Sequence, residues 1–406
     1  MAGNYRELPV TSQLSYIPHM PYNQLNRGTI LDESKRRYQY KGKGSYGVVY
    51  TNTQSNSPSI IKRYFYPEDL READTKSRTF ATMSGNSKVA GIRENVQSTN
   101  LSNMSPPSYS ISILRMPYFG ENFFNVIDSK KTDEYIRKIT SQPDYITKIL
   151  HSIQLLLQYT ANIAANGYCH GDMHMDNIMI EPSTCEMHMI DFDFFQPFDT
   201  YTKLIIEGAR KNLFHYMIPP EYLFLRIMKP DEISYEQIKI HHANNKYAEL
   251  PIIRNYLFYF MNVPPHHDDK ILINAPDVVD AAHIAYINEC NQNNFTYFME
   301  LKDQMKEFNF LSLISSQFMQ YFDNFGLGMG LQFLLYRIYN NSHPPEKIKA
   351  TLQLLKQMSS FTIKERPTPK EAYDKMTEII SQKGGRRKTV RRNRHRRKTH
   401  HKKRKQ

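Results

Sequence analysis

The chain has 406 residues, of which 40% are hydrophobic and 23% charged, enough apolar content for the core of one bilobal unit or about two to three domains. It has no run of about 18 apolar residues, which excludes a membrane-spanning helix, and we expect no secretory signal at its N-terminus. Its cysteines, Cys169, Cys185 and Cys290, are widely separated, which excludes a disulfide framework and a cysteine-rich zinc site.

The net charge of +13 is concentrated at the C-terminal end. The segment from Lys383 to Gln406 contains 14 of the 53 Lys and Arg residues and no acidic residue, so the other 39 nearly match the 40 acidic residues. With almost no apolar side chain, residues 381–406 are predicted to be a disordered polybasic tail. Its functional interpretations are binding to nucleic acid or another acidic partner, nuclear targeting, or weak polyanion binding by a solvated tail.

The N-terminal part of the chain predicts a small β-rich lobe over residues 38–120, after a polar extension over 1–37. Strands are predicted within 38–50, at 59–62 and at 109–114, with a helix at 67–83. Residues 84–107 are rich in Ser, Asn and Gly, and they are predicted to form a loop.

After Gly120 the pattern predicts a larger helical lobe over residues 121–380. Apolar residues at helical spacing predict helices at 145–165, 327–338 and 367–380. Short strands are predicted at 177–180 and 187–190. Residues from about 225 to 318 carry no readable chemistry and are predicted to be an insertion.

A glycine-rich segment in the small lobe is the first sign of phosphate chemistry. Gly42, Gly44 and Gly47 follow the GxGxxG spacing, and glycines allow the backbone to approach phosphates closely. The last glycine runs into strand residues rather than a helix, which favours a strand–turn–strand nucleotide clamp over a dinucleotide site. An ordinary glycine-bearing hairpin is the alternative. The candidate nucleotide-binding residues are Gly42, Lys43, Gly44, Ser45, Tyr46, Gly47, Val48, Val49 and Tyr50.

Lys62 lies on the next predicted strand, where its ammonium group can hold nucleotide phosphates. Further along, Asp172 is followed five residues later by Asn177, a spacing that lets a carboxylate meet the attacking hydroxyl while an amide oxygen binds a metal. Asp191 follows a short apolar strand and is the second candidate Mg²⁺ ligand. A transition-metal site at His170, His174 and Asp176 is the alternative.

These segments together resemble the eukaryotic-type protein kinase superfamily, in the style of divergent serine/threonine kinases of large DNA viruses. The motifs, which stand in the order of that family, are GKGSYGVV, IIK, HGDMHMDN, MIDFD, Ile218-Pro219-Pro220-Glu221, the segment from Asp323 to Gly328, and Arg366-Pro367-Thr368.

The resemblance implies a bilobal α+β fold that binds ATP and Mg²⁺ and phosphorylates Ser or Thr of proteins. It implies Met116 as gatekeeper, and a hinge over 117–119 in which Tyr118 or Phe119 supplies the N–H to adenine, because Pro117 has none. It also implies a pair between Arg366 and Glu221. An intracellular location follows, in host cytoplasm, nucleus or virion.

The chain departs from the family at several positions. Gly171 replaces a common Arg that meets an activation-segment phosphate, which argues against activation by phosphorylation. His174 replaces a Lys, and Asp193 replaces a Gly, which adds charge and stiffness. Glu72 is the candidate helix partner of Lys62, although it follows it too closely, and Phe80 falls near the usual position.

Two other functions remain open. The Gly171-Asp172-x-His174 string resembles aminoglycoside and choline phosphotransferases, which favours a small-molecule acceptor. The other function is that of an inactive kinase-fold scaffold that binds nucleic acid through its tail. The oligomeric state is not indicated.

Overall fold

The structure is a computed structural model of the chain. It describes residues 38–43, 47–52, 59–64, 67–90, 92–97, 110–127, 129–206, 219, 317–339 and 343–382, with short pieces between 289 and 304. The predicted N-terminal extension, most of the predicted insertion and the polybasic segment after residue 382 lie outside these ranges, as do Gly44 to Tyr46 and Glu221.

The small lobe is built on a five-stranded antiparallel sheet with the strand order β1-β2-β3-β5-β4. β-Branched and aromatic residues make up most of β2 and half of β3, and such residues suit a pleated surface. The register pairs Val49 of β2 with Lys62 of β3, and Lys62 with Leu114 of β5. The strands are β1 (Tyr38–Lys43), β2 (Gly47–Asn52), β3 (Ser59–Tyr64), β4 (Ile92–Gln97) and β5 (Ser110–Pro117).

Strand β4 corrects the prediction of a continuous loop over residues 84–107. A short 3₁₀ turn (Ser87–Val89) precedes it, and it pairs along its whole length with β5 at the edge of the sheet. Its sequence, IRENVQ, contains only two apolar residues, so it lacks the alternation that identifies a half-buried strand. The pairing with β5 stabilises it instead of an apolar face of its own.

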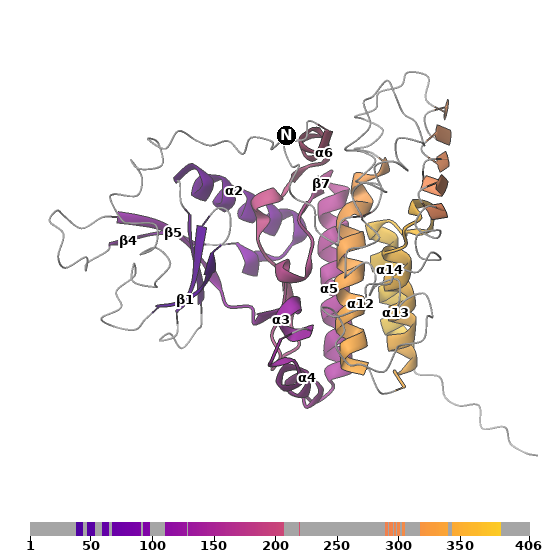
Figure 1. The fold of residues 1–406 in the computed structure, drawn as a ribbon, viewed down its shortest axis with the longest axis horizontal. Helices are drawn as coiled ribbons and strands as arrows, with labels where there is room; N and C mark the ends of the chain where they lie inside the picture. The colour runs from indigo at the N-terminus through magenta and orange to yellow at the C-terminus, as the bar shows by residue number, and fades with distance from the viewer. Residues whose placement is uncertain are drawn as a thin grey trace, which may run out of the picture.

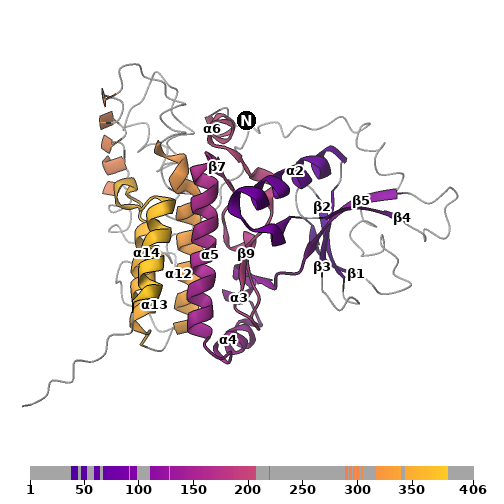
Figure 2. The same ribbon diagram turned by 180° about the vertical axis from the view of Figure 1, so that it is seen from behind.

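Helix α2 (Pro67–Ser84), predicted from its sequence, connects the two lobes. Its first turns pack Leu70 and Ala73 against Leu114 of the sheet. Its last turns place Phe80, which is fully buried, in the core of the large lobe. Figure 2 shows α2 between the sheet and the long helix α5 (Tyr145–Ala165). The position of α2 therefore depends on both lobes.

The large lobe is a group of long helices beside the small lobe (Figure 1). The predicted helices at 145–165, 327–338 and 367–380 are confirmed as α5, α12 (Phe322–Tyr339) and α14 (Pro369–Ser381). Helix α13 (Glu346–Met358) packs against α12 and α14. Shorter helices are α3 (Phe123–Ile127), α4 (Thr132–Thr140) and α6 (Phe198–Ile206).

The ends of two helices follow directly from their sequences. Helix α5 ends at Asn166 and Gly167, and Gly167 adopts a φ of +74°, which glycine takes without steric cost. Helix α14 begins with a capping box in which Thr368 accepts from the N–H of Glu371 and the Glu371 side chain accepts from the N–H of Thr368.

Short strands in the large lobe frame the loops that face the small lobe. They are β6 (Glu121–Asn122), β7 (Tyr168–Cys169), β8 (Ile178–Ile180), β9 (Met187–Met189) and β10 (Gln196–Pro197). β8 and β9 confirm the strands predicted near 177–180 and 187–190. A sheet lobe joined through one helix to a helical lobe, with paired loops between them, confirms the bilobal α+β arrangement expected from the sequence.

The three cysteines are buried free thiols. No helix in the part of the chain that the structure describes has the length and apolar content needed to cross a bilayer.

Candidate active site

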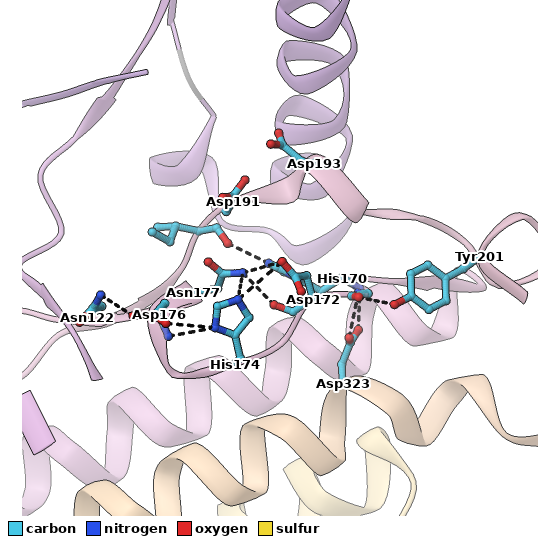
Figure 3. A network of polar contacts seen from close by, with 12 residues as sticks. Asn122, His170, Asp172, His174, Asp176, Asn177, Asp191, Asp193, Tyr201 and Asp323 are labelled. Carbon is cyan, nitrogen blue, oxygen red and sulfur yellow. Dashed lines mark hydrogen bonds and ion pairs between the residues drawn. The ribbon is translucent and has the colours of Figure 1, made fainter. Parts of the chain in front are cut away.

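The loop between β7 and β8 brings Asp172 and Asn177 together (Figure 3). The Asn177 side-chain NH₂ donates to the Asp172 backbone oxygen at 2.8 Å and to its carboxylate Oδ2 at 3.1 Å. Both side chains are largely covered. Since the NH₂ of Asn177 faces Asp172, the amide oxygen is the atom that Asn177 can offer to a metal ion.

His174 lies on the same loop, between the carboxylates of Asp172 and Asp176. Its Nε2 lies 3.6 Å from Asp172 Oδ2 and its Nδ1 lies 3.6 Å from Asp176 Oδ2. Burial alone would lower the pKa of His174, but the hydrogen bonds and charges of these two carboxylates outweigh it and raise the pKa to about 9. These two carboxylates favour a protonated imidazole beside Asp172, whereas the Asp176 N–H, 3.3 Å from Nδ1, favours the neutral ring.

A buried carboxylate of helix α12 holds the start of this loop. Asp323 Oδ2 accepts a hydrogen bond of 2.6 Å from the backbone N–H of His170, and its Oδ1 accepts one of 3.0 Å from that of Gly171. Asp323 is 5% exposed, and this burial raises its pKa although the two N–H donors oppose the shift. The sequence identified Asp323 only as the start of a helix, so this role was missed.

A glycine on α12 allows that close approach. A Cβ atom on Gly326 would lie 2.2 Å from the backbone oxygen of Met173. No side chain fits at that distance, so the glycine lets the helix backbone contact the loop directly. The Asp323–x–x–Gly326 spacing is the signal that marks this contact in the sequence.

Gly171 has a φ of +76°, and a Cβ atom there would lie 2.5 Å from Cε2 of Tyr201. Tyr201, on α6, is buried and donates its hydroxyl proton to the Gly171 backbone oxygen. The segment that follows Asp191 is also joined to β7 by the pairing of β10. The space next to residue 171 thus holds an aromatic ring of that same segment.

Asp191 connects the loop that carries Asp172 with the small lobe. The preceding residue, Ile190, donates its N–H to the Asn177 backbone oxygen at 3.0 Å. The Ile190 backbone oxygen lies 3.0 Å from the His170 ring nitrogen Nε2. Asp191 then takes a φ of +62°, and its Oδ1 lies 2.8 Å from the Lys62 ammonium nitrogen. Burial raises the pKa of Asp191, but the charge and hydrogen bond of Lys62 prevail and hold it below its usual range.

Lys62 makes a second ion pair, with Asp193 Oδ2 at 2.8 Å. Burial and the neighbouring carboxylate of Asp191 raise the pKa of Asp193 to about 6. The prediction that Glu72 pairs with Lys62 is wrong. Glu72 is 65% exposed and pairs with Lys76, one turn along its own helix, at 2.6 Å. It follows Lys62 too closely in the sequence to turn back toward it.

Phe80, the residue of α2 near the usual glutamate position, belongs to an aromatic cluster. Its ring stacks on Phe192 with centroids 4.2 Å apart and meets Phe195 edge-on at 5.4 Å. The His170 ring contacts the same cluster, 6.4 Å from Phe80. This cluster fixes α2 on the segment that carries Asp191 and Asp193.

The structure describes the residues on both sides of the predicted glycine clamp. Gly42 and Lys43 end β1, and the residues from Gly47 to Tyr50 lie in β2, with a bulge near Gly42. Ser45 and its neighbours Gly44 and Tyr46 lie outside the described residues. The two flanks are antiparallel strands, whereas a dinucleotide site has a helix after its glycines.

The predicted hinge lies at the end of β5, between the lobes. Met116 and Pro117 are the last strand residues, and the Tyr118 hydroxyl donates to Glu121 Oε1 at 2.9 Å. Burial, together with the Glu121 charge, raises the pKa of Tyr118. The Phe119 ring lies 4.3 Å from that of His188 on β9.

The chemistry of the donor set fits Mg²⁺, which prefers carboxylate and amide oxygens. Asp191 and Asn177 supply such oxygens, and the Ile190–Asn177 hydrogen bond holds their backbones side by side. The transition-metal alternative is wrong, because the buried His170 ring faces the Ile190 carbonyl rather than His174. Within the described ranges, no cluster of three or more His, Cys, Asp or Glu is arranged to bind a metal.

Arg366, predicted to pair with Glu221, is buried. Its Nε donates to the Ser360 backbone oxygen at 2.6 Å, and its guanidinium lies 4.8 Å from the centre of the Phe325 ring. Because Glu221 lies outside the described residues, the pair with it stays a prediction.

No model of a known protein family matches the chain, and no curated protein matches it. Among solved structures, the chain is similar to the crystal structure of the specific rhoptry antigen kinase domain of Toxoplasma gondii. The identity is 10% and the TM-score is 0.42, over 85% of this chain and 82% of that one. The assignment of a kinase-like fold rests here on the strand order and on the geometry of the loops.

Proposed function

We propose that this protein is an ATP-dependent protein kinase that transfers the γ-phosphoryl group to Ser or Thr hydroxyls. The observation that carries the proposal is the convergence of residues from distant segments. Lys62 of the small lobe lies 2.8 Å from Asp191, whose preceding residue is bonded to Asn177, which in turn holds Asp172. A structural ion pair alone does not require an amide and a second carboxylate on the adjoining loop.

The proposed roles follow from the chemistry of each side chain. Lys62 binds the phosphates as a point charge, and Asp172 orients the acceptor hydroxyl and accepts its proton. Asn177 keeps the Asp172 carboxylate in place through its hydrogen bond. A Mg²⁺ ion held by Asp191 and Asn177 would neutralise the charge of the phosphates. Positioning and electrostatics thus supply most of the rate.

The test is transfer of phosphate from Mg²⁺-ATP to a peptide library, read by mass spectrometry with the purified full chain. Asp172→Asn and Asp191→Asn should each lower the rate by at least about 100-fold. Asp133→Asn is the matched control, since Asp133 is 93% exposed on α4, and it should leave the rate unchanged. Unchanged transfer by Asp191→Asn would contradict the metal assignment.

A small-molecule phosphotransferase is the second candidate, favoured by His174 beside Asp172 in the Gly171-Asp172-x-His174 string. The same preparation assayed with aminoglycosides and choline separates the two candidates. Transfer to these alcohols with none to peptides would establish the second one. Phosphoserine or phosphothreonine in the library supports the first, and phosphotyrosine alone would contradict its Ser/Thr part.

An inactive scaffold would bind nucleotide without turnover and retain DNA through its polybasic tail. The ion pair of Lys62 with Asp191 argues for activity, since both charges that bind nucleotide and metal are present. We also propose that activity needs no phosphate on the segment after Asp191. Tyr201 already joins that segment to Gly171, at the position where an Arg would bind such a phosphate.

A further inference from the structure

The Lys62 ammonium lies between two carboxylates of one short turn. Its Nζ is 2.8 Å from Asp191 Oδ1 and 2.8 Å from Asp193 Oδ2. The two acids differ in their surroundings, because the Asp191 side chain is 38% exposed and that of Asp193 is 11% exposed. Asp191, the more exposed of the two, is the acid proposed to bind metal. Asp193, the more buried, pairs with the same lysine.

The turn itself explains how both acids reach one nitrogen atom. Asp191 has a left-handed conformation with a φ of +62°, and residues 192–194 form a 3₁₀ turn closed by the Phe195 N–H on the Phe192 oxygen at 3.0 Å. The chain thereby turns back on itself within two residues. A glycine at position 193, as in the family pattern, would supply no carboxylate there.

Helix α2 fixes Asp193 through its backbone. The Lys76 ammonium donates to the Asp193 backbone oxygen at 2.5 Å, and Phe80, one turn further, stacks on Phe192. A movement of α2 would therefore move the carboxylate that holds Lys62. The helix acts on Lys62 through the turn, while its own Glu72 pairs with Lys76.

We propose that Asp193 is a positioning residue that holds Lys62 toward the nucleotide phosphates once Asp191 is engaged by metal. The proposal rests on the proposed function and deepens it. A carboxylate shared with the metal cannot fully neutralise the lysine, so a second acid is needed to fix its orientation. Asp193 supplies that acid and connects it to α2.

The test is a double-mutant cycle of Lys62→Met and Asp193→Asn, read by calorimetric ATP and ADP affinity at saturating Mg²⁺. Asp193→Asn should weaken ATP binding about tenfold, the scale of one charge-assisted hydrogen bond, and should raise KM for ATP more than it lowers kcat. In the Lys62→Met background the same change should have less than a twofold effect. Asp193→Glu should recover part of the affinity.

Two controls separate the carboxylate of Asp193 from a general effect of charge. Asp199→Asn removes an exposed acid a few residues further along, and Glu72→Gln removes the exposed acid of α2. Both should stay within twofold of the wild type. Circular dichroism melting checks that each variant is folded, and Asp193→Asn, with nearly the same shape as the original, is the least disruptive change.

Specific outcomes would overturn the inference. Equal effects of Asp193→Asn with and without Lys62 would show that the acid does not act through the lysine. A shift only in the Mg²⁺ concentration needed for binding would make Asp193 a metal ligand instead. In both cases a wild-type protein that still transfers phosphate leaves the proposed function intact, whereas a wild type that binds no nucleotide overturns both.

Discussion

The candidate site has two faces, one formed by the Asp172 loop of the large lobe and one by Lys62 of the small lobe, and different forces hold them in place. On the large-lobe face, the loop that carries Asp172 is bonded to Asp323 of α12 through backbone N–H groups, in a region that excludes water. On the small-lobe face, Lys62 is held by ion pairs with a turn, and one of its two partners is 38% exposed. The first face depends on buried hydrogen bonds and the second on charge.

The difference has a functional meaning. A buried N–H group that is left unpaired costs about 1–3 kcal/mol of folding free energy. The loop that carries Asp172 therefore has one stable arrangement. Ion pairs that are partly open to solvent are weaker and can exchange partners. The lysine face can therefore rearrange when nucleotide and metal bind, while the Asp172 face remains fixed.

The largest expected effect is that of Asp323→Ala on the fixed face. It leaves two buried N–H groups, of His170 and Gly171, without an acceptor, and should lower the free energy of unfolding by about 3–5 kcal/mol. Urea denaturation measures it. The control is Lys88→Gln, which removes an exposed ion pair with Glu186 and should cost less than about 0.5 kcal/mol. Equal losses in the two variants would erase the contrast between buried hydrogen bonds and exposed ion pairs.

A matched pair of glycines tests the packing of the fixed face. Gly171 and Gly167 have nearly the same φ, +76° and +74°, but only at Gly171 would a Cβ atom meet Tyr201; at Gly167 nothing lies within 4 Å. Gly167→Ala should cost about 1–2 kcal/mol for its backbone conformation. Gly171→Ala should cost at least about 1 kcal/mol more because of the clash. Equal melting temperatures for these variants would show that Tyr201 does not fill the space beside the loop.

The third expected effect is a pH dependence of the stability that arises from His174. Its pKa is raised from 6.5 to about 9, so the folded state keeps a proton that the unfolded state has lost between these values. The stabilisation is complete below pH 6.5 and is lost as the pH rises to 9, by up to about 3 kcal/mol. Urea denaturation between pH 6 and 9, without divalent cations, should show a smaller decline for His174→Gln. An unchanged decline would contradict the charged imidazole.

Parts of this site were predictable and others were not, for physical reasons. The spacing of Asp172 and Asn177 predicted that both lie on one loop, because residues only five positions apart fit within a single short connection. The partner of Lys62 was not predictable in the same way. Glu72 is an acid on the expected helix, but the acid that pairs with Lys62 is Asp193, which lies 131 residues further along the chain. Local pattern contains no information about such a distant pair.

The sequence by itself determined helices α2, α5, α12 and α14, most strands of the small lobe and the order of the phosphate-binding motifs, because hydrophobic periodicity and glycine placement are local properties. The tertiary structure alone decided which acid holds Lys62, why residue 171 is a glycine, and that Asp323 supports the loop. Edge strand β4 belongs with these, since its pairing with β5 rather than its own composition stabilises it. Each of these features depends on contacts between segments that are distant along the chain, and such contacts exist only in the folded protein.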